Sequence, residues 1–60
     1  MLWALAARIR DEHYAATVDD IRALLGSGCA AARIREVLST LAARWPDAPF
    51  SVALSALEIA

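Results

Sequence analysis

The sequence of 60 residues predicts an all-α fold, in which three to four short helices form a small orthogonal bundle and a single domain over residues 1–60. Apolar residues recur in four successive stretches at the three- and four-residue spacing of amphipathic helices. Glycines and prolines lie at the edges of these stretches, where helices usually end. The chain has no internal repeat, low-complexity run or long linker, so one helical unit is expected.

The first predicted helix covers residues 2–15, with an apolar stripe of Leu2, Leu5, Ala6, Ile9 and His13. The second begins after Thr17, whose hydroxyl can cap it while Asp20 reaches back to the Thr17 N–H, as in a capping box with Asp in place of Glu. Asp19 and Asp20 also favour the positive end of the helix dipole. The buried face of this helix is expected to be Val18, Ile21, Leu24 and Leu25.

The third predicted helix follows a glycine-rich turn. Gly26 is expected to end the second helix in the left-handed conformation, and the segment "GSG" supplies the turn. The third helix then runs from about Ala30 to Arg44, with an apolar stripe of Ile34, Val37, Leu38, Leu41 and Trp45. Pro46 ends it, because the residue before a proline avoids the helical region.

The last stretch is predicted as a fourth helix capped by Asp47, with Pro49 tolerated in its first turn. The apolar face of this helix is Phe50, Ala53, Leu54 and Leu57. A strand over "FSVALSALEIA" is the alternative, although apolar and polar residues do not alternate cleanly there.

The composition indicates a protein that relies on a partner. Hydrophobic residues make up 60% of the chain. A chain this short buries only about 60% of its unfolded surface when it folds, so it cannot cover all of its apolar side chains by itself. A single cysteine cannot form an internal disulfide, and one cysteine with one histidine does not make a metal site. We therefore expect stabilisation by another protein chain or by self-association, with no metal and no other cofactor.

The charge pattern and the first residues restrict the class of partner and the compartment. The net charge is −1, and the six basic residues, all arginine, form no basic patch, which argues against nucleic acid as a partner. The opening segment "MLWALAAR" is too short and too soon charged for a signal peptide or a membrane span. A cytoplasmic protein without membrane contact is expected.

No residue is predicted to be catalytic. His13 is the only imidazole, and the acidic residues next to it in sequence lie on other helical faces, so a general base would lack its partner. Cys29 lies near a predicted helix N-terminus, which can lower a thiol pKa, but no second His or Cys completes a site there. Asp19 and Asp20 point in different directions and are explained by capping. The chain is not expected to be an enzyme by itself, and a place within an enzyme assembly is left open.

Two tryptophans and two arginines are candidates for contacts. Trp45 continues the stripe of the third predicted helix and is expected in the core. Trp3 lies off the stripe of the first predicted helix in a chain too small to cover every face, and tryptophan is enriched in interface hot spots. Arg33 and Arg35 can meet phosphate or the carboxylates of another protein, with a solvated helix face as the alternative. The predicted interface residues are therefore Trp3, Arg33 and Arg35.

The segment "TVDDIRALLGSGCAAARIREVLSTL" resembles a helix-turn-helix, with a capped helix, a glycine turn and a second helix of I-x-x-x-L-x-x-L spacing. Its turn is longer than the usual one by about two residues. The would-be recognition helix opens with "CAAA", which has no donors for base edges. A small DNA-binding or protein-interaction adaptor is the alternative function.

A longer pattern runs from residue 9 to residue 57 and consists of Ile9, Tyr14, Ala15, the segment "TVDDI", Leu25, Leu38, Leu41, Pro46, Val52, Leu54 and Leu57. In its order and spacing this pattern resembles the C-terminal helical region of the crotonase (enoyl-CoA hydratase/isomerase) superfamily, especially the 3-hydroxyisobutyryl-CoA hydrolase branch. Trp45 stands where that family usually has the serine that caps the last helix, and Phe50 and Ser51 stand near a position often held by lysine.

The resemblance implies a non-catalytic role. In that superfamily the catalytic carboxylates and the oxyanion-hole amides belong to a ββα core that these residues do not include, so no catalytic residue is carried over. The C-terminal helices of the family pack over the acyl-CoA site and take part in subunit association. The implied function is a helical packing and association module beside a catalytic core on another chain, with only indirect contact to acyl-CoA.

Overall fold

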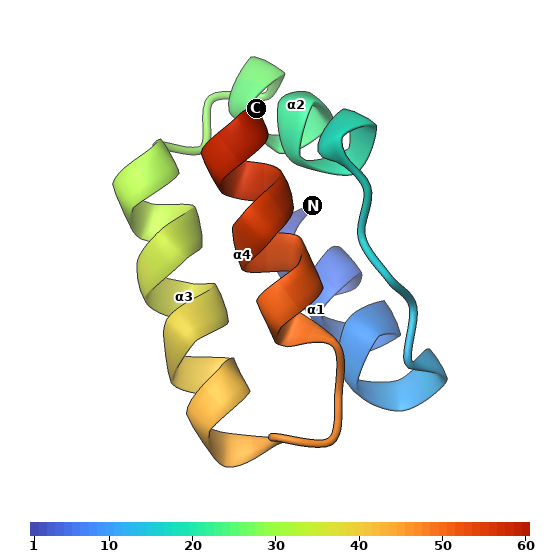
Figure 1. The fold of residues 1–60 in the computed structure, drawn as a ribbon. Coiled ribbons are helices and arrows are strands. Elements are labelled where there is room, and N and C mark those ends of the chain that lie inside the picture. The colour runs from blue at the N-terminus through green and yellow to red at the C-terminus, as the bar shows by residue number, and fades with distance from the viewer.

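The computed structural model describes all of residues 1–60 and contains four α-helices and no strand. They are α1 (Leu2–Glu12), α2 (Val18–Gly26), α3 (Ala31–Arg44) and α4 (Phe50–Ile59). The predicted all-α fold is confirmed, and the strand alternative for the last stretch is wrong. In Figure 1, α3 and α4 lie side by side as an antiparallel pair, and α2 crosses near the C-terminal end of α4.

The core consists of apolar side chains alone and draws on every helix. The six largest fully buried side chains are Phe50, Ile9, Ile21, Leu24, Ile34 and Leu38. Full burial of one such side chain stabilises the fold by roughly 1.5–3 kcal/mol. Because α4 packs against both α2 and α3, it is the central element of the bundle.

The end of α1 comes three residues earlier than predicted. His13 adopts the left-handed conformation with φ 53°, which histidine tolerates better than most side chains. The Tyr14 N–H then donates to the Arg8 carbonyl at 3.3 Å, closing the helix end. His13 is exposed, so its place in the predicted apolar stripe is wrong.

The start of α2 agrees with the prediction, but its end differs. Thr17 caps the helix and forms the full capping box with Asp20. Gly26 still belongs to α2, and the residue in the left-handed region is Gly28, with φ 98°. The helical hydrogen bonding continues past the predicted stop, since the Ser27 N–H donates to the Ala23 carbonyl at 3.0 Å, and the Ser27 hydroxyl also donates to the Leu24 carbonyl at 2.8 Å.

The connection between α3 and α4 corrects a second capping prediction. Asp47 does not cap α4, whose N-cap is Pro49 with no side-chain hydrogen bond. The connection instead folds into a compact turn, in which the Ala48 N–H donates to the Trp45 carbonyl at 3.1 Å. That turn leaves Asp47 exposed and two residues ahead of the N-cap position, which Pro49 occupies.

Candidate functional site

Trp3 is one of four large hydrophobic side chains that are exposed, at 60% exposure, and it is the only one of them that belongs to α1. It lies between two adjoining hollows along α1 and α3. The smaller, of about 60 Å³, is lined by Trp3, Ala6, Ala7, Arg10, Leu41 and Phe50. The larger, of about 220 Å³, is lined by Trp3, Arg33, Glu36, Val37, Thr40 and Leu41. These residues together are called the Trp3 groove below.

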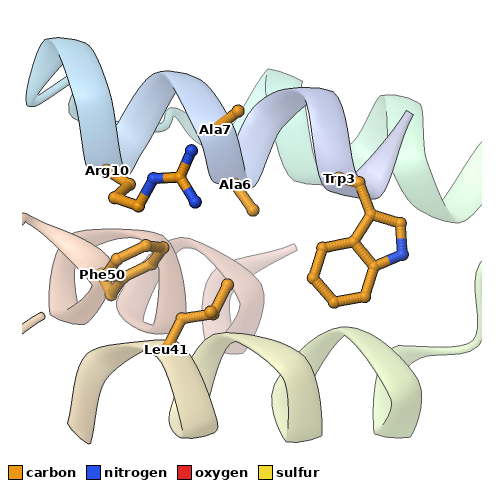
Figure 2. Close-up of a pocket in the computed structure, with 6 residues that line it drawn as sticks. All are labelled: Trp3, Ala6, Ala7, Arg10, Leu41 and Phe50. Carbon is orange, nitrogen blue, oxygen red and sulfur yellow. The ribbon is translucent and has the colours of Figure 1, made fainter. Parts of the chain in front are cut away.

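Helical spacing and small residues create the groove. Trp3, Ala7 and Arg10 occupy one flank of α1, next to its buried stripe, because they follow each other at four and three residues. Figure 2 shows the Trp3 indole and the Leu41 side chain reaching into the gap between α1 and α3, with Ala6 pointing into the same gap. An alanine at that point leaves space that a longer side chain would fill.

The rim of the groove carries charges without partners. Arg33 and Glu36 both lie on the flank of α3 that faces Trp3, and neither forms an ion pair within the chain. At the other end of the groove, Arg10 is paired with Asp11 at 2.7 Å. The groove therefore combines an apolar floor with one free cation and one free anion at its edge.

The three predicted interface residues do not lie together. Trp3 and Arg33 line the same hollow. Arg35 follows Arg33 by two residues, which turns its side chain by about 200° around the helix axis and places it on the opposite flank of α3. Arg35 is exposed and lines no hollow of the structure.

The prediction that Trp45 is a core residue is wrong. Trp45 is half-buried at the C-cap of α3 and packs against the edge of the core. The guanidinium carbons of Arg44 and Arg10 lie 5.0 Å and 5.5 Å from the centroid of its ring. Trp45 thus joins α1 to the end of α3 through cation–π contacts.

The residues with reactive side chains are dispersed. His13 is exposed at the end of α1. Cys29 is half-buried with a free thiol, and its backbone N–H donates to the Leu24 carbonyl at 3.2 Å. No three His, Cys, Asp or Glu side chains come together at a spacing that could hold a metal ion.

The titration shifts of Asp20 and Tyr14 have a structural cause. The Thr17 N–H donates to Asp20 at 2.9 Å and lowers the pKa of this carboxyl, and the Tyr14 hydroxyl adds to the effect. The same hydrogen bond to Asp20 raises the pKa of Tyr14. Arg8 covers the Tyr14 ring, with its guanidinium carbon 3.9 Å from the centroid. These four residues fasten the corner between α1 and α2.

Arg8 and Tyr14, which hold this corner, are functional candidates that sequence reasoning missed. Arg8 and Asp20 also line a hollow of about 230 Å³ between α1 and α2, together with Met1, Ala4, Leu5, Ala23 and Leu24. The aromatic residue just ahead of the capping box was the available signal, because a side chain at that point can pack against the helix start.

No helix of the structure combines the length and the apolarity needed to cross a membrane. Comparison of the chain with protein-family models, with curated proteins and with solved structures gives no match.

Proposed function

We propose that this chain is a non-catalytic association module that binds another protein through the Trp3 groove. The observation that carries the proposal is the indole of Trp3, which is 60% exposed beside the smaller, mainly apolar hollow and shares the larger hollow with unpaired Arg33. An apolar centre with an aromatic anchor and a polar rim is the usual anatomy of a protein interface.

The groove suggests what the partner offers. An apolar side chain of the partner would insert between Trp3 and Leu41, which both hollows share. A carboxylate of the partner would meet Arg33, and a cation would meet Glu36. Such a pairing at the rim adds orientation and specificity more than raw affinity.

The proposed partner is the catalytic core of a crotonase-type acyl-CoA enzyme on another chain. Its support is the resemblance of residues 9–57 to the C-terminal helices of that superfamily. In this proposal the chain covers the core and takes part in subunit association, and it contacts acyl-CoA only through the partner. The free thiol of Cys29 suits the reducing cytoplasm.

The alternative, a helix-turn-helix adaptor that binds DNA, has weaker support. In this chain α2 packs on α4 more than on α3, whereas a helix-turn-helix joins its two helices directly. Arg33 and Arg35 lie on opposite flanks of α3, so they do not form one basic face toward a groove of DNA.

The test is co-purification of the tagged chain with three versions compared: wild type, Trp3→Ala and Arg35→Ala. We expect a stoichiometric partner with wild type and with Arg35→Ala, and its loss with Trp3→Ala. Mass spectrometry then tells whether the partner holds a crotonase-type core. Retention of the partner by Trp3→Ala would overturn the assigned surface. Specific binding of DNA by the isolated chain in a low-salt shift assay would favour the adaptor instead.

A further inference from the structure

The outer face of α4 is a second unpartnered surface. Two of the four exposed large hydrophobic residues are on this helix, Val52 at 43% and Ile59 at 70% exposure. They flank Ser55 along one stripe, and Ser51 and Glu58 lie beside them. The residues Ser51, Val52, Ser55, Glu58 and Ile59 are called the outer α4 stripe below.

The outer α4 stripe is separate from the Trp3 groove. Phe50 lies on the buried face of α4 and lines the smaller hollow of that groove. The outer stripe occupies the opposite side of the helix, so it points away from the groove. Glu58 is the only charged residue in α4. Val52 and Ile59 therefore leave apolar side chains uncovered on this face of α4.

The two ends of α4 have complementary electrostatic defects. At the N-terminus no side chain caps the helix and no acidic residue lies in the first turn. The amides of Ser51 and Val52 therefore face outward at the positive end of the helix dipole without an anion. At the other end, Glu58 places a negative charge in the last turn, where the dipole is unfavourable for it.

We propose that α4 pairs in antiparallel orientation with α4 of a second copy of this chain. A two-fold axis beside Ser55, at the midpoint between residues 52 and 59, sets Val52 against Ile59 of the second copy, and Ile59 against its Val52. The same operation brings each Glu58 beside the uncapped first turn of the other helix, where the amides and the Ser51 hydroxyl can donate to it. A parallel pairing would place the two Glu58 side chains together and leave both helix N-termini open.

The spacing and size of the stripe define the kind of dimer. Val52, Ser55 and Ile59 follow at three and four residues, the spacing of a two-helix seam, and Ser55 allows close approach at the axis. The ten residues of α4 span about 15 Å, so the contact belongs to the small class of interfaces, below about 1,200 Å². A dissociation constant on the order of 100 µM is expected for so small a contact. The net charge of −1 adds little repulsion between copies.

The first test measures the molecular mass of the isolated chain by sedimentation. The protein concentration is varied from about ten-fold below to about ten-fold above the expected dissociation constant. Ser55→Arg places two cations at the axis and should keep the chain monomeric. Ser39→Arg, the same change on an exposed position of α3, is the control and should dimerise as wild type does. The helical circular dichroism of both variants should match wild type. A wild-type chain that stays monomeric throughout, or a Ser55→Arg variant that dimerises normally, would overturn the proposal.

The second test checks the orientation. Ser51→Glu sets a carboxylate beside Glu58 of the other copy, and dimerisation should weaken by about two- to five-fold. The double variant Ser51→Glu/Glu58→Arg restores opposite charges across the pair and should recover the wild-type constant. Trp3→Ala should leave the constant unchanged, which separates this surface from the proposed function. Tighter dimerisation of Ser51→Glu, failure of the double variant to recover, or loss of the dimer in Trp3→Ala would each contradict an antiparallel α4 pair.

Discussion

One carboxylate oxygen of Asp20 joins three donors at the corner between α1 and α2. Its Oδ2 atom accepts from the Tyr14 hydroxyl at 2.5 Å, from the Thr17 N–H at 2.9 Å and from the Thr17 hydroxyl at 3.1 Å. The Asp20 N–H in turn donates to Thr17 Oγ1 at 3.2 Å. The connection after α1 is therefore held by side-chain hydrogen bonds where regular secondary structure is absent.

At this residue scale, Thr17→Ala should lower the free energy of unfolding by about 1 kcal/mol, the usual cost of losing a Ser/Thr cap. The hydroxyl of Thr17 makes both side-chain bonds with Asp20, and alanine removes both. Thr17→Ser keeps the hydroxyl and should be nearly neutral. Urea unfolding followed by circular dichroism measures both variants, and equal losses would refute the capping account.

The lowered pKa of Asp20 predicts a stability that depends on pH. The Thr17 N–H is the largest cause, and the Tyr14 hydroxyl is the next. Because the folded pKa lies below that of an unfolded Asp, about 3.9, the contribution is fully present above that pH and is lost as the pH falls through the folded pKa. Between about pH 6 and pH 3 the wild type should lose more stability than Asp20→Asn, with Tyr14→Phe between them. Equal losses in all three proteins would contradict the assignment.

At the scale of helices and turns, the two glycines have different roles that their sequence context does not reveal. Gly26 lies inside α2 with an ordinary helical backbone, whereas Gly28 has φ 98° in the turn before α3. A Cβ added to either residue meets no atom within 4 Å. The backbone conformation alone therefore decides the effect of a substitution.

Gly26→Ala should stabilise the chain by about 0.5 to 1 kcal/mol, because alanine is the better helix former and restricts the unfolded chain. Gly28→Ala should destabilise it by about 1 kcal/mol, because a side chain in the left-handed region is strained. Thermal unfolding of the two variants beside wild type is the measurement. The two substitutions should change the stability in opposite directions. A stabilising Gly28→Ala would show that the turn has a different backbone conformation.

Phe50 and Trp45 lie five residues apart on either side of the second connection but hold the helices differently. Phe50 is fully buried at the start of α4, whereas Trp45 is half-buried between two arginines. Phe50→Ala should cost about 3 to 5 kcal/mol, enough to unfold a chain of this size. Trp45→Ala should cost about 1 to 2 kcal/mol and leave the helices folded. Denaturant titrations measure the free energy of unfolding of both variants. An equal loss for Trp45→Ala and Phe50→Ala would show that Trp45 is a core residue.

As a whole molecule, the chain is as compact as a monomer of its size. Its accessible surface is 3641 Å², and size scaling gives about 3,800 Å² for its mass. The radius of gyration is 10.0 Å, close to the scaling value of about 10.4 Å. The exposure of Trp3, Val52 and Ile59 is therefore a property of a closed structure, and these residues are available for contacts with other chains.

Features set by neighbouring residues could be predicted from the sequence, and features set by distant ones could not. The capping box of Thr17 and Asp20 involves residues three positions apart, and it was predicted correctly. The Asp47 cap was predicted wrongly, because α4 begins two residues later than that cap requires, with the fully buried Phe50 as its first residue. The sequence singled out Trp3 and Arg33 separately, but their common groove depends on how α1 lies against α3.

The central claim is that Trp3 anchors a protein partner, and a calorimetric titration of the co-purified partner tests it most directly. Trp3→Ala should weaken binding by 2 kcal/mol or more, which is about 30-fold at 25 °C. The helical circular dichroism of the variant should stay intact, and Arg35→Ala should bind as wild type does. Equal affinity of the wild type and Trp3→Ala for the partner would contradict the account.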